Sequence, residues 1–172
     1  STSNSVDGFT LYLHANYIEL CGSDGKVAVL NLEHYAKNNM EITAPWDARQ
    51  KNVVLGATRC KKVSSGGMER VVMFSNAANG YESAISYSEG TLYFPKTNLK
   101  MLGKAHESAT AVQGVGDDLT VFKEREIFEF NCNANGRFTV RQVSDIIGCD
   151  CPDTVELCAN RLVWLCSNGR VY

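Results

Sequence analysis

The sequence predicts an all-β fold, and three observations lead to that prediction. Short apolar runs rich in Val, Ile, Phe and Tyr recur along the 172 residues. Turn sequences rich in Gly, Asn, Asp and Ser separate these runs, as they separate the strands of antiparallel sheets. No segment carries a long apolar stripe at the 3.6-residue period of an amphipathic helix. We therefore expect small antiparallel sheets joined by tight turns.

The expected strands follow one another at short intervals. The turns Gly22–Lys26, Asn133–Gly136 and Ser167–Gly169 contain Asn or Gly, which tolerate the positive φ of tight hairpins. Two further segments, Asn31–Met40 and Val143–Ile147, are expected to form short turns of helix. In chain order the strands are "FTLYL", "NYIEL", "KVAVLNL", "NVVLG", "RVVMF", "SAISY", "TLYFP", "LTVF", "EIFEF", "RFTV" and "RLVWL".

Four of these strands resemble one another and are regularly spaced. They begin at Val27, Val71, Leu119 and Leu162, so their starts lie 44, 48 and 43 residues apart. A period of about 40–50 residues with several short strands is typical of propeller blades, which are small antiparallel sheets packed against their neighbours. The spacing predicts propeller-like repeats, and a β-sandwich with evenly spaced strands is the alternative.

The repeats divide the chain into blade-like units within a single β-repeat domain, residues 1–172. The last unit has a hairpin but no outer strands. Either the N-terminal strands complete this blade, or the chain is a piece of a larger ring, and the small number of units favours the larger ring. The open edge of the hairpin is expected to be covered by residues 9–20 or by a second copy of the chain. The approximate units are 1–52, 53–100, 101–147 and an incomplete 148–172. The large apolar residues of the similar strands are expected to form the core, and they include Val71, Met73, Val121, Phe122, Leu162 and Trp164.

Composition argues against several classes of partner. The net charge is −2, and the only dense basic cluster, Arg59–Lys62, is short, so we expect no nucleic-acid partner. No apolar run approaches the roughly 20 residues that a membrane helix needs, so we expect no membrane partner. The seven cysteines are an odd number and several lie in apolar runs, which favours reduced thiols in a protein that folds in a cytosol.

The stretch "GCDCPDT" is the most conspicuous motif for metal chemistry. A Cys149-x-Cys151 pair can bind a soft metal, but a structural zinc site needs four ligands and no histidine lies nearby. Gly148 and Pro152 instead favour a tight turn. We expect no metal, and no disulfide between Cys149 and Cys151, because a gap of one residue strains such a bridge.

Other familiar catalytic patterns are lacking. His14, His34 and His106 stand outside any metal or nucleophile motif. The segment Gly114–Leu119 lacks the full glycine pattern of a phosphate loop and precedes a strand. The charged segment Lys123–Glu126 lies between two apolar runs and is expected to form an exposed hairpin turn.

A glycoside hydrolase would need two carboxylates facing one another. Many acidic residues lie at turns, where Asp also stabilises structure, and no pair stands out among Asp24, Asp117, Asp118, Asp150 and Asp153. Trp46 is the only strong candidate for a sugar-stacking residue in a loop. The sequence therefore assigns no catalytic, cofactor-binding or metal-binding residue, and we expect no enzyme.

The second half of the chain carries a series of short structural motifs. They are a "YFP…N" strand, a Gly turn, an "ITA"-like segment, "D-x-L-x-VFKE" and an "I-aromatic" strand. Here these are Tyr93–Pro95 with Asn98, Gly103, Ala109–Ala111, Asp118–Glu124 and Ile127–Phe128. In this pattern the chain resembles head–tail or tail structural proteins of tailed phages and prophages. The segment Ile147–Tyr172 resembles the next unit of the same kind. Departures are the degenerate "ATA" and residues 1–52, which match no blade pattern.

The resemblance implies a non-catalytic, propeller-type scaffold in a virion, assembled in the cytoplasm of a bacterial host. It implies other virion proteins, or further copies of the chain, as partners, and it carries over no catalytic residue. The second hypothesis is a carbohydrate- or peptide-binding propeller module for host recognition, since propeller loops offer natural ligand sites. A glycoside hydrolase on the same scaffold is the third. No cofactor is expected, and any small-molecule ligand is unknown.

Overall fold

The computed structural model describes residues 10–14, 17–21, 27–31, 57–77, 79–90 and 95–172, with side chains described only from residue 57 onward. Within these ranges the chain is all-β, as predicted, and its only helical elements are the 3₁₀ turns η1 (Lys96–Asn98) and η2 (Pro152–Thr154). None of the described helices has the length and apolar character needed to cross a membrane.

The described strands form four antiparallel sheets, in each of which hydrogen-bonded neighbours are consecutive in sequence. The N-terminal sheet has the order β1-β2-β3, and the second sheet has the order β4-β5-β6-β7. The turn between β4 and β5 is Gly66–Gly67, where φ values of 62° and 74° suit residues without a Cβ. The strands are β1 (Thr10–His14), β2 (Tyr17–Cys21), β3 (Val27–Asn31), β4 (Ala57–Ser65), β5 (Met68–Asn76), β6 (Ala84–Tyr87) and β7 (Leu99–Met101).

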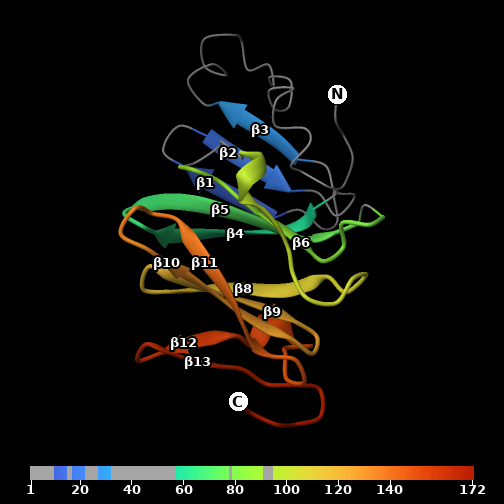
Figure 1. Cartoon of the computed structure of the whole chain (residues 1–172). Helices are drawn as coiled ribbons and strands as arrows, with labels where there is room; N and C mark the ends of the chain where they lie inside the picture. Colours follow the sequence, from blue (N-terminus) through green and yellow to red (C-terminus); the bar gives the residue numbers. More distant parts are fainter. Residues whose placement is uncertain (1–9, 15–16, 22–26, 32–56, 78, 91–94) are drawn as a thin grey trace.

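The third sheet repeats the design of the second, with its four strands in the order β8-β9-β10-β11. The C-terminal sheet is a hairpin of two short strands, β12 and β13. Figure 1 shows the four sheets stacked in chain order from the N-terminal to the C-terminal end. The strands are β8 (Ala109–Val115), β9 (Asp118–Lys123), β10 (Ile127–Cys132), β11 (Phe138–Ser144), β12 (Glu156–Cys158) and β13 (Arg161–Val163).

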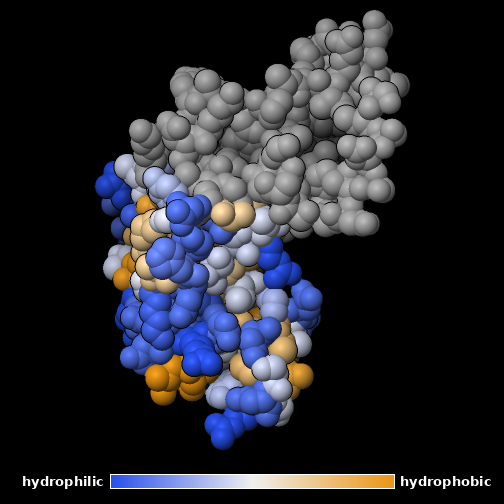
Figure 2. Space-filling view, turned by 90° about the vertical axis from the view of Figure 1, so that its right-hand side faces the viewer, coloured by the Kyte–Doolittle hydropathy of each residue, from blue (hydrophilic) through white to orange (hydrophobic). Residues whose placement is uncertain are grey.

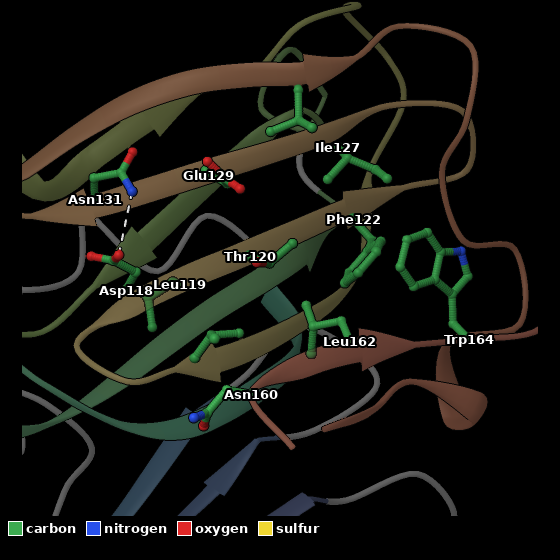
Figure 3. A pocket seen from close by; sticks show the side chains of 12 residues that line it. Asp118, Leu119, Thr120, Phe122, Ile127, Glu129, Asn131, Asn160, Leu162 and Trp164 are labelled. Atoms are coloured by element: carbon green, nitrogen blue, oxygen red, sulfur yellow. Dashed lines mark hydrogen bonds between the residues drawn. The ribbon is translucent and has the colours of Figure 1, made fainter. Parts of the chain in front are cut away.

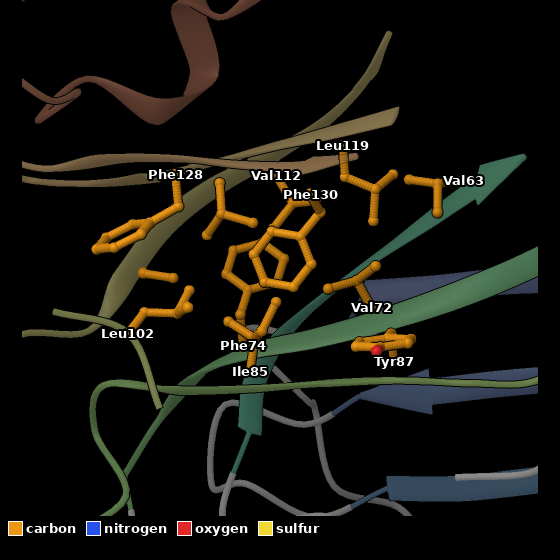
Figure 4. Close-up of a cluster of buried hydrophobic side chains, with 12 residues drawn as sticks. Val63, Val72, Phe74, Ile85, Tyr87, Leu102, Val112, Leu119, Phe128 and Phe130 are labelled. Carbon is orange, nitrogen blue, oxygen red and sulfur yellow. The ribbon is translucent and has the colours of Figure 1, made fainter. Parts of the chain in front are cut away.

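The main core lies between the second and third sheets (Figure 4). Each sheet contributes one face, because successive side chains of a strand point to opposite sides. Tyr87 of the second sheet meets Phe130 and Phe138 of the third edge to face, with ring centroids 6.2 and 5.1 Å apart. The buried members are Val63, Val72, Phe74, Ile85, Tyr87, Leu102, Ala109, Val112, Leu119, Val121, Phe128 and Phe130.

The predicted repeat agrees with the sheets in part. Val71 and Leu119 both lie on the second strand of a four-stranded sheet, and both are fully buried. Leu162 lies on the second strand of the C-terminal sheet, whereas Val27 lies on the third strand of the N-terminal sheet. The chain is thus a series of antiparallel meanders. The repeat positions correspond most closely in the two four-stranded sheets, where both lie on the second strand.

Several element predictions need correction. Val143 and Ser144 end strand β11 rather than beginning a helical turn. The sequence does not predict strand β4, because its run "ATRCKKVSS" is largely polar and contains the basic cluster Arg59–Lys62. Strand β8, "ATAVQGV", was also missed, since its small residues form no strong apolar run. The helical turn predicted over Asn31–Met40 extends outside the described residues, as do the runs "NVVLG" and most of "TLYFP".

The core prediction holds for the central sheets and fails for the C-terminal one. Val71, Met73, Val121 and Phe122 are at most 1% exposed, as expected. Leu162 and Trp164 are only half-buried and pack against a smaller cluster formed by Ala111, Phe122, Ile127 and Cys149. A sheet of two strands cannot surround these side chains as a four-stranded sheet does.

Alanine substitution of two leucines at equivalent repeat positions should therefore have unequal effects. Leu119→Ala is expected to lower the free energy of unfolding by about 2–5 kcal/mol, because it leaves a cavity in a closed core. Leu162→Ala should cost less, since part of that side chain already contacts water. Urea denaturation of both variants checks this, and an equal or larger cost at Leu162 would contradict the assignment.

The segment Lys123–Glu126 forms the predicted hairpin turn between β9 and β10, but only Glu124 and Arg125 are exposed. Lys123 and Glu126 are 0% and 2% exposed and form an ion pair with Nζ and Oε2 2.8 Å apart. The Lys123 ammonium also donates to the carbonyls of Leu102 and Lys104, both at 2.7 Å. Glu126 accepts hydrogen bonds from the Lys104 amide at 3.1 Å and from Gln142 at 2.9 Å. The pair thereby anchors the segment after β7 to the third sheet.

A second buried cation joins the second and third sheets. Arg70 on β5 is fully buried and donates to the Ser88 carbonyl at 3.1 Å and to the Gly136 carbonyl at 2.7 Å. Its guanidinium lies 5.1 Å from the ring centroid of Phe138 on β11 and 3.4 Å from the Glu89 carboxylate. The planar group therefore satisfies polar groups at the edge of the core and fixes the two sheets to each other.

Candidate interaction groove

A groove of about 300 Å³ lies between the third sheet and the C-terminal sheet (Figure 3). Strand alternation explains its lining, because side chains two residues apart share a face of the sheet. Leu119 is an exception among the lining residues, because its side chain also belongs to the main core on the opposite face of the sheet. The lining residues are Val115, Asp118, Leu119, Thr120, Phe122, Ile127, Glu129, Asn131, Val143, Asn160, Leu162 and Trp164.

The third sheet supplies the floor of the groove. Alternate positions of β9 present Asp118, Thr120 and Phe122, and alternate positions of β10 present Ile127, Glu129 and Asn131 (Figure 3). The intervening residues of both strands point to the main core on the opposite face. One end of the floor is therefore apolar, and the other carries carboxylate, hydroxyl and amide groups.

The wall opposite comes from β13 and the turn before it. Trp164 packs edge to face on Phe122, with ring centroids 4.9 Å apart, and stacks on Tyr172 at 5.7 Å. Its indole N–H donates to the Gly148 carbonyl at 2.9 Å, which fixes the ring orientation. Leu162 and Asn160 continue the same face of the hairpin (Figure 3). The wall is thus rigid at Trp164 and open towards Asn160.

The carboxylates of the groove are engaged in contacts within the third sheet. Asp118 accepts hydrogen bonds from the Cys132 amide at 2.7 Å and from Asn131 Nδ2 at 3.3 Å. Glu129 forms an ion pair with Arg141, with 2.5 Å between Oε2 and the guanidinium nitrogen. Both groups therefore have structural partners, and the arrangement suits hydrogen bonding to a bound chain better than proton transfer.

Most of the other acidic residues that the sequence places at turns have structural partners there. Asp117 accepts a hydrogen bond from the Gly66 amide at 3.1 Å, and Asp153 lies 3.4 Å from Arg59. Asp150 accepts hydrogen bonds from the hydroxyl and the amide of Ser167, and these bonds lower its pKa. Asp24 and Trp46 lie outside the described residues.

The histidines do not meet in a site within the described residues. His14 ends strand β1, and His34 lies outside the described ranges. His106 is exposed and its Nδ1 lies 3.5 Å from the Glu82 carboxylate. Across the described part of the chain, no group of three or more His, Cys, Asp or Glu residues is arranged to hold a metal ion.

The Cys149–Cys151 segment packs closely against the buried Lys123 turn. The Cys149 amide donates to the Lys123 carbonyl at 2.8 Å, and Thr110 Oγ1 donates to the Cys149 carbonyl at 2.6 Å. A Cβ on Gly148 would overlap the Lys123 carbonyl oxygen, so glycine is required there by close approach. The segment is therefore a packed turn, as its sequence predicts, and Cys149 and Cys151 both carry free thiols.

The two thiols should be poorly reactive. Burial is the main cause that raises the pKa of Cys149 and of Cys151, and the nearby Asp150 carboxylate adds to both shifts. Because the thiolate is the reactive species, iodoacetamide at neutral pH is expected to modify the exposed Cys158 well before Cys149. Peptide mass mapping after timed alkylation measures the two rates, and equal rates in the native protein would disprove the buried position of Cys149.

The C-terminal end of the molecule also exposes apolar side chains. Figure 2 shows orange, apolar surface at the lower end of the molecule, where Figure 1 places β12 and β13. Leu157, Val163 and Leu165 are 36–41% exposed, and Val171 is 66% exposed. Exposed apolar residues gathered at one end of a molecule are typical of surfaces that contact another protein.

Comparison with known proteins gives no assignment of this site. No protein-family model matches the chain, and no curated protein sequence matches it. The sheets, the groove and the sequence resemblance described above are the features that indicate a function.

Proposed function

We propose that this chain is a non-catalytic structural component of a phage or prophage particle, built as a propeller-type scaffold. The observation that carries the proposal is the repeated meander. Two consecutive four-stranded sheets pack face to face, and a further sheet lies against the outer face of the third. Neighbouring blades of a propeller pack in this manner. The chain acts through its shape and surfaces, in a virion assembled in a bacterial cytoplasm.

The resemblance to phage structural proteins supports the proposal through its position in the fold. The segments Asp118–Glu124 and Ile127–Phe128 correspond to β9 and to the start of β10, the central strands of the third sheet. Ala109–Ala111 begins β8, and Gly103 packs against the buried Glu126. The described part of the shared pattern thus consists of residues that build a sheet and its anchoring turn, as expected of a scaffold, whereas Tyr93 and Phe94 lie outside the described residues.

Peptide binding is the second candidate function, and the groove favours it. The groove combines apolar walls with hydrogen-bonding groups along a strand edge, which suits an extended polypeptide. Sugar hydrolysis is less well supported, because Asp118 and Glu129 are already held by donors of the third sheet.

Analysis of purified particles tests the proposal. After prophage induction in the source bacterium, the chain is expected in density-purified particles at a fixed ratio to portal or tail proteins. Genes for portal, terminase or tail proteins are expected beside its own gene. A chain found only in the particle-free lysate, with no such neighbouring genes, would disprove the proposed role.

A further inference from the structure

A cavity of about 350 Å³ lies between the second and third sheets, apart from the groove described above. The end of β6 and the segment from η1 to β7 form the side that belongs to the second sheet. The β10–β11 turn and the start of β11 form the side that belongs to the third sheet. The cavity adjoins the main core, because Tyr87 of that core and Phe138, which packs against it, both line the cavity.

Tyr87 gives the cavity a hydroxyl group on a buried side chain. The residue is 5% exposed and lies at one end of the core cluster (Figure 4). Its carbonyl accepts a hydrogen bond from Asn98 at 3.1 Å, but no group in the described part of the chain forms a hydrogen bond with its hydroxyl. Among the described residues, Glu107 Oε2 is the only enclosed side-chain oxygen without a partner. The Tyr87 oxygen is therefore reached by solvent, and the cavity that Tyr87 lines gives it that access.

The hydroxyl of Tyr87 is a donor at neutral pH. Burial raises the pKa of Tyr87, although the nearby Arg70 guanidinium opposes this shift. The phenol therefore keeps its proton and can donate it in a hydrogen bond. Because a polar group on a buried side chain normally has a partner, this hydroxyl favours a ligand that accepts a hydrogen bond.

The charged side chains around the cavity leave an excess of positive charge. Glu89 lines the cavity, but its carboxylate lies 3.4 Å from the Arg70 guanidinium and accepts a hydrogen bond from Asn98 at 3.1 Å. Lys100 and Arg137 also line the cavity, and no acidic group of the described residues forms an ion pair with either side chain. The cavity therefore attracts an anion and repels a cation.

We propose that this cavity binds a small organic anion, with a carboxylate or a phosphate carried on an apolar body. The anionic group accepts a hydrogen bond from Tyr87 and is attracted by Lys100 and Arg137. The apolar body contacts the rings of Tyr87 and Phe138, which meet edge to face with centroids 5.1 Å apart. The site goes beyond the proposed role in a particle and does not depend on it.

The test compares ring compounds of similar shape that differ in charge. Benzoate is anionic, benzamide is neutral and benzamidine is cationic, while phenyl phosphate carries the other anionic group. Titration calorimetry of the full chain measures their dissociation constants. At least one of the two anions should bind about 10-fold or more tightly than benzamide, the value of a hydrogen bond to a charged group, and benzamidine should bind more weakly than benzamide. The tighter anion distinguishes a carboxylate ligand from a phosphate ligand. The inference is overturned if neither anion binds more tightly than benzamide.

Two variants of the lining residues locate the bound anion. Tyr87→Phe removes the hydroxyl and keeps the ring that packs in the core, so affinity for the tighter anion should fall about 10-fold. Its matched control is Tyr81→Phe, at a tyrosine that is 41% exposed and lies outside the cavity. Arg137→Gln should weaken binding about 2–5-fold, since a charge at an exposed rim contributes less, whereas Arg125→Gln on the β9–β10 turn should not. Equal affinities of Tyr87→Phe and Tyr81→Phe would overturn the inference.

NMR spectra of the unmodified chain give a result that requires no variant to fold. Addition of the tighter anion should shift the amide signals of Lys100, Arg137 and Phe138, which line the cavity. The amide signal of Cys158, in the C-terminal hairpin, should stay unchanged. Shifts confined to residues outside the cavity would place the anion at another site and overturn the inference.

Discussion

The variant Glu126→Gln is expected to lower the free energy of unfolding by about 3–5 kcal/mol, one of the two largest effects in the molecule. The substitution leaves the Lys123 ammonium in a site where it is 0% exposed and has lost its counter-charge. The two carbonyls that also bind Lys123 carry partial charge only. Removing one partner of a buried pair costs more than the pair itself contributes, because the remaining charge has no water to solvate it.

Denaturation of a small set of variants measures this effect. The control is Glu124→Gln, an exposed glutamate in the same turn, whose effect should be within about 0.5 kcal/mol. The double variant Lys123→Met with Glu126→Leu should recover much of the loss, since apolar replacement of a whole buried pair is often close to neutral. If Glu126→Gln unfolds at the same denaturant concentration as Glu124→Gln, the pair is not buried as described.

The same pair should make stability depend on pH. Burial acts to raise the pKa of Glu126, but hydrogen bonds from Lys123 and the Lys104 amide outweigh it, so the pKa lies below its usual value. A carboxyl with a lowered pKa in the folded state stabilises the fold above the unfolded pKa, about 4.3, and this contribution is lost as the pH falls through the folded value. The difference between the wild type and Glu126→Gln should therefore narrow below about pH 4.3. A constant difference from pH 7 to pH 3 would contradict this.

The second large effect is expected at Arg70. Arg70→Leu should cost about 3 kcal/mol or more, because it leaves the carbonyls of Ser65, Ser88 and Gly136 without this donor. A buried acceptor without a partner costs about 1–3 kcal/mol. The substitution also removes the cationic contacts with the rings of Tyr87 and Phe138 at 5.9 and 5.1 Å.

Two controls separate the charge of Arg70 from its shape. Arg70→Lys keeps the charge but loses the planar group that donates in several directions, so its stability should lie between wild type and Arg70→Leu. Arg137→Leu alters an exposed arginine in the β10–β11 turn and should have little effect. The midpoints of thermal unfolding of the three variants give the order of their stabilities. Equal midpoints for Arg70→Leu and Arg137→Leu would show that Arg70 does not join the two sheets.

The strands of the central sheets could be predicted from sequence because local and tertiary requirements coincide there. The run Leu119–Phe122 alternates between two buried faces, and Val71–Phe74 is apolar throughout, so both indicate strands without knowledge of their partners. The turn Asn133–Gly136 likewise carries its own signal, since Gly136 has a φ of 72°. These two strands and this turn are determined by residues that are close in sequence, so the sequence alone predicts them.

The buried charges and the groove could not be predicted in the same way. Lys123 and Glu126 flank a turn between strands, where charged residues usually face water, and the carbonyls that bury Lys123 come from residues about twenty positions earlier. Leu162 and Trp164 repeat the pattern of core residues, but their burial depends on how many strands surround them. The sequence shows the alternating pattern of β9, but it does not show that Leu162 lies opposite β9 and forms the other wall of the groove.

The pairing of every strand with its neighbour in sequence has a consequence for how the chain folds. In each of the described sheets, hydrogen-bonded strands are joined by a single turn or loop, and among the described strands none is inserted between two others from a distant segment. Closing short loops costs little entropy, and contacts between near neighbours favour fast folding. Each meander can thus form as soon as its own residues leave the ribosome, before the next is synthesised. Duplication of one meander would add a layer without disturbing the pairing of the others.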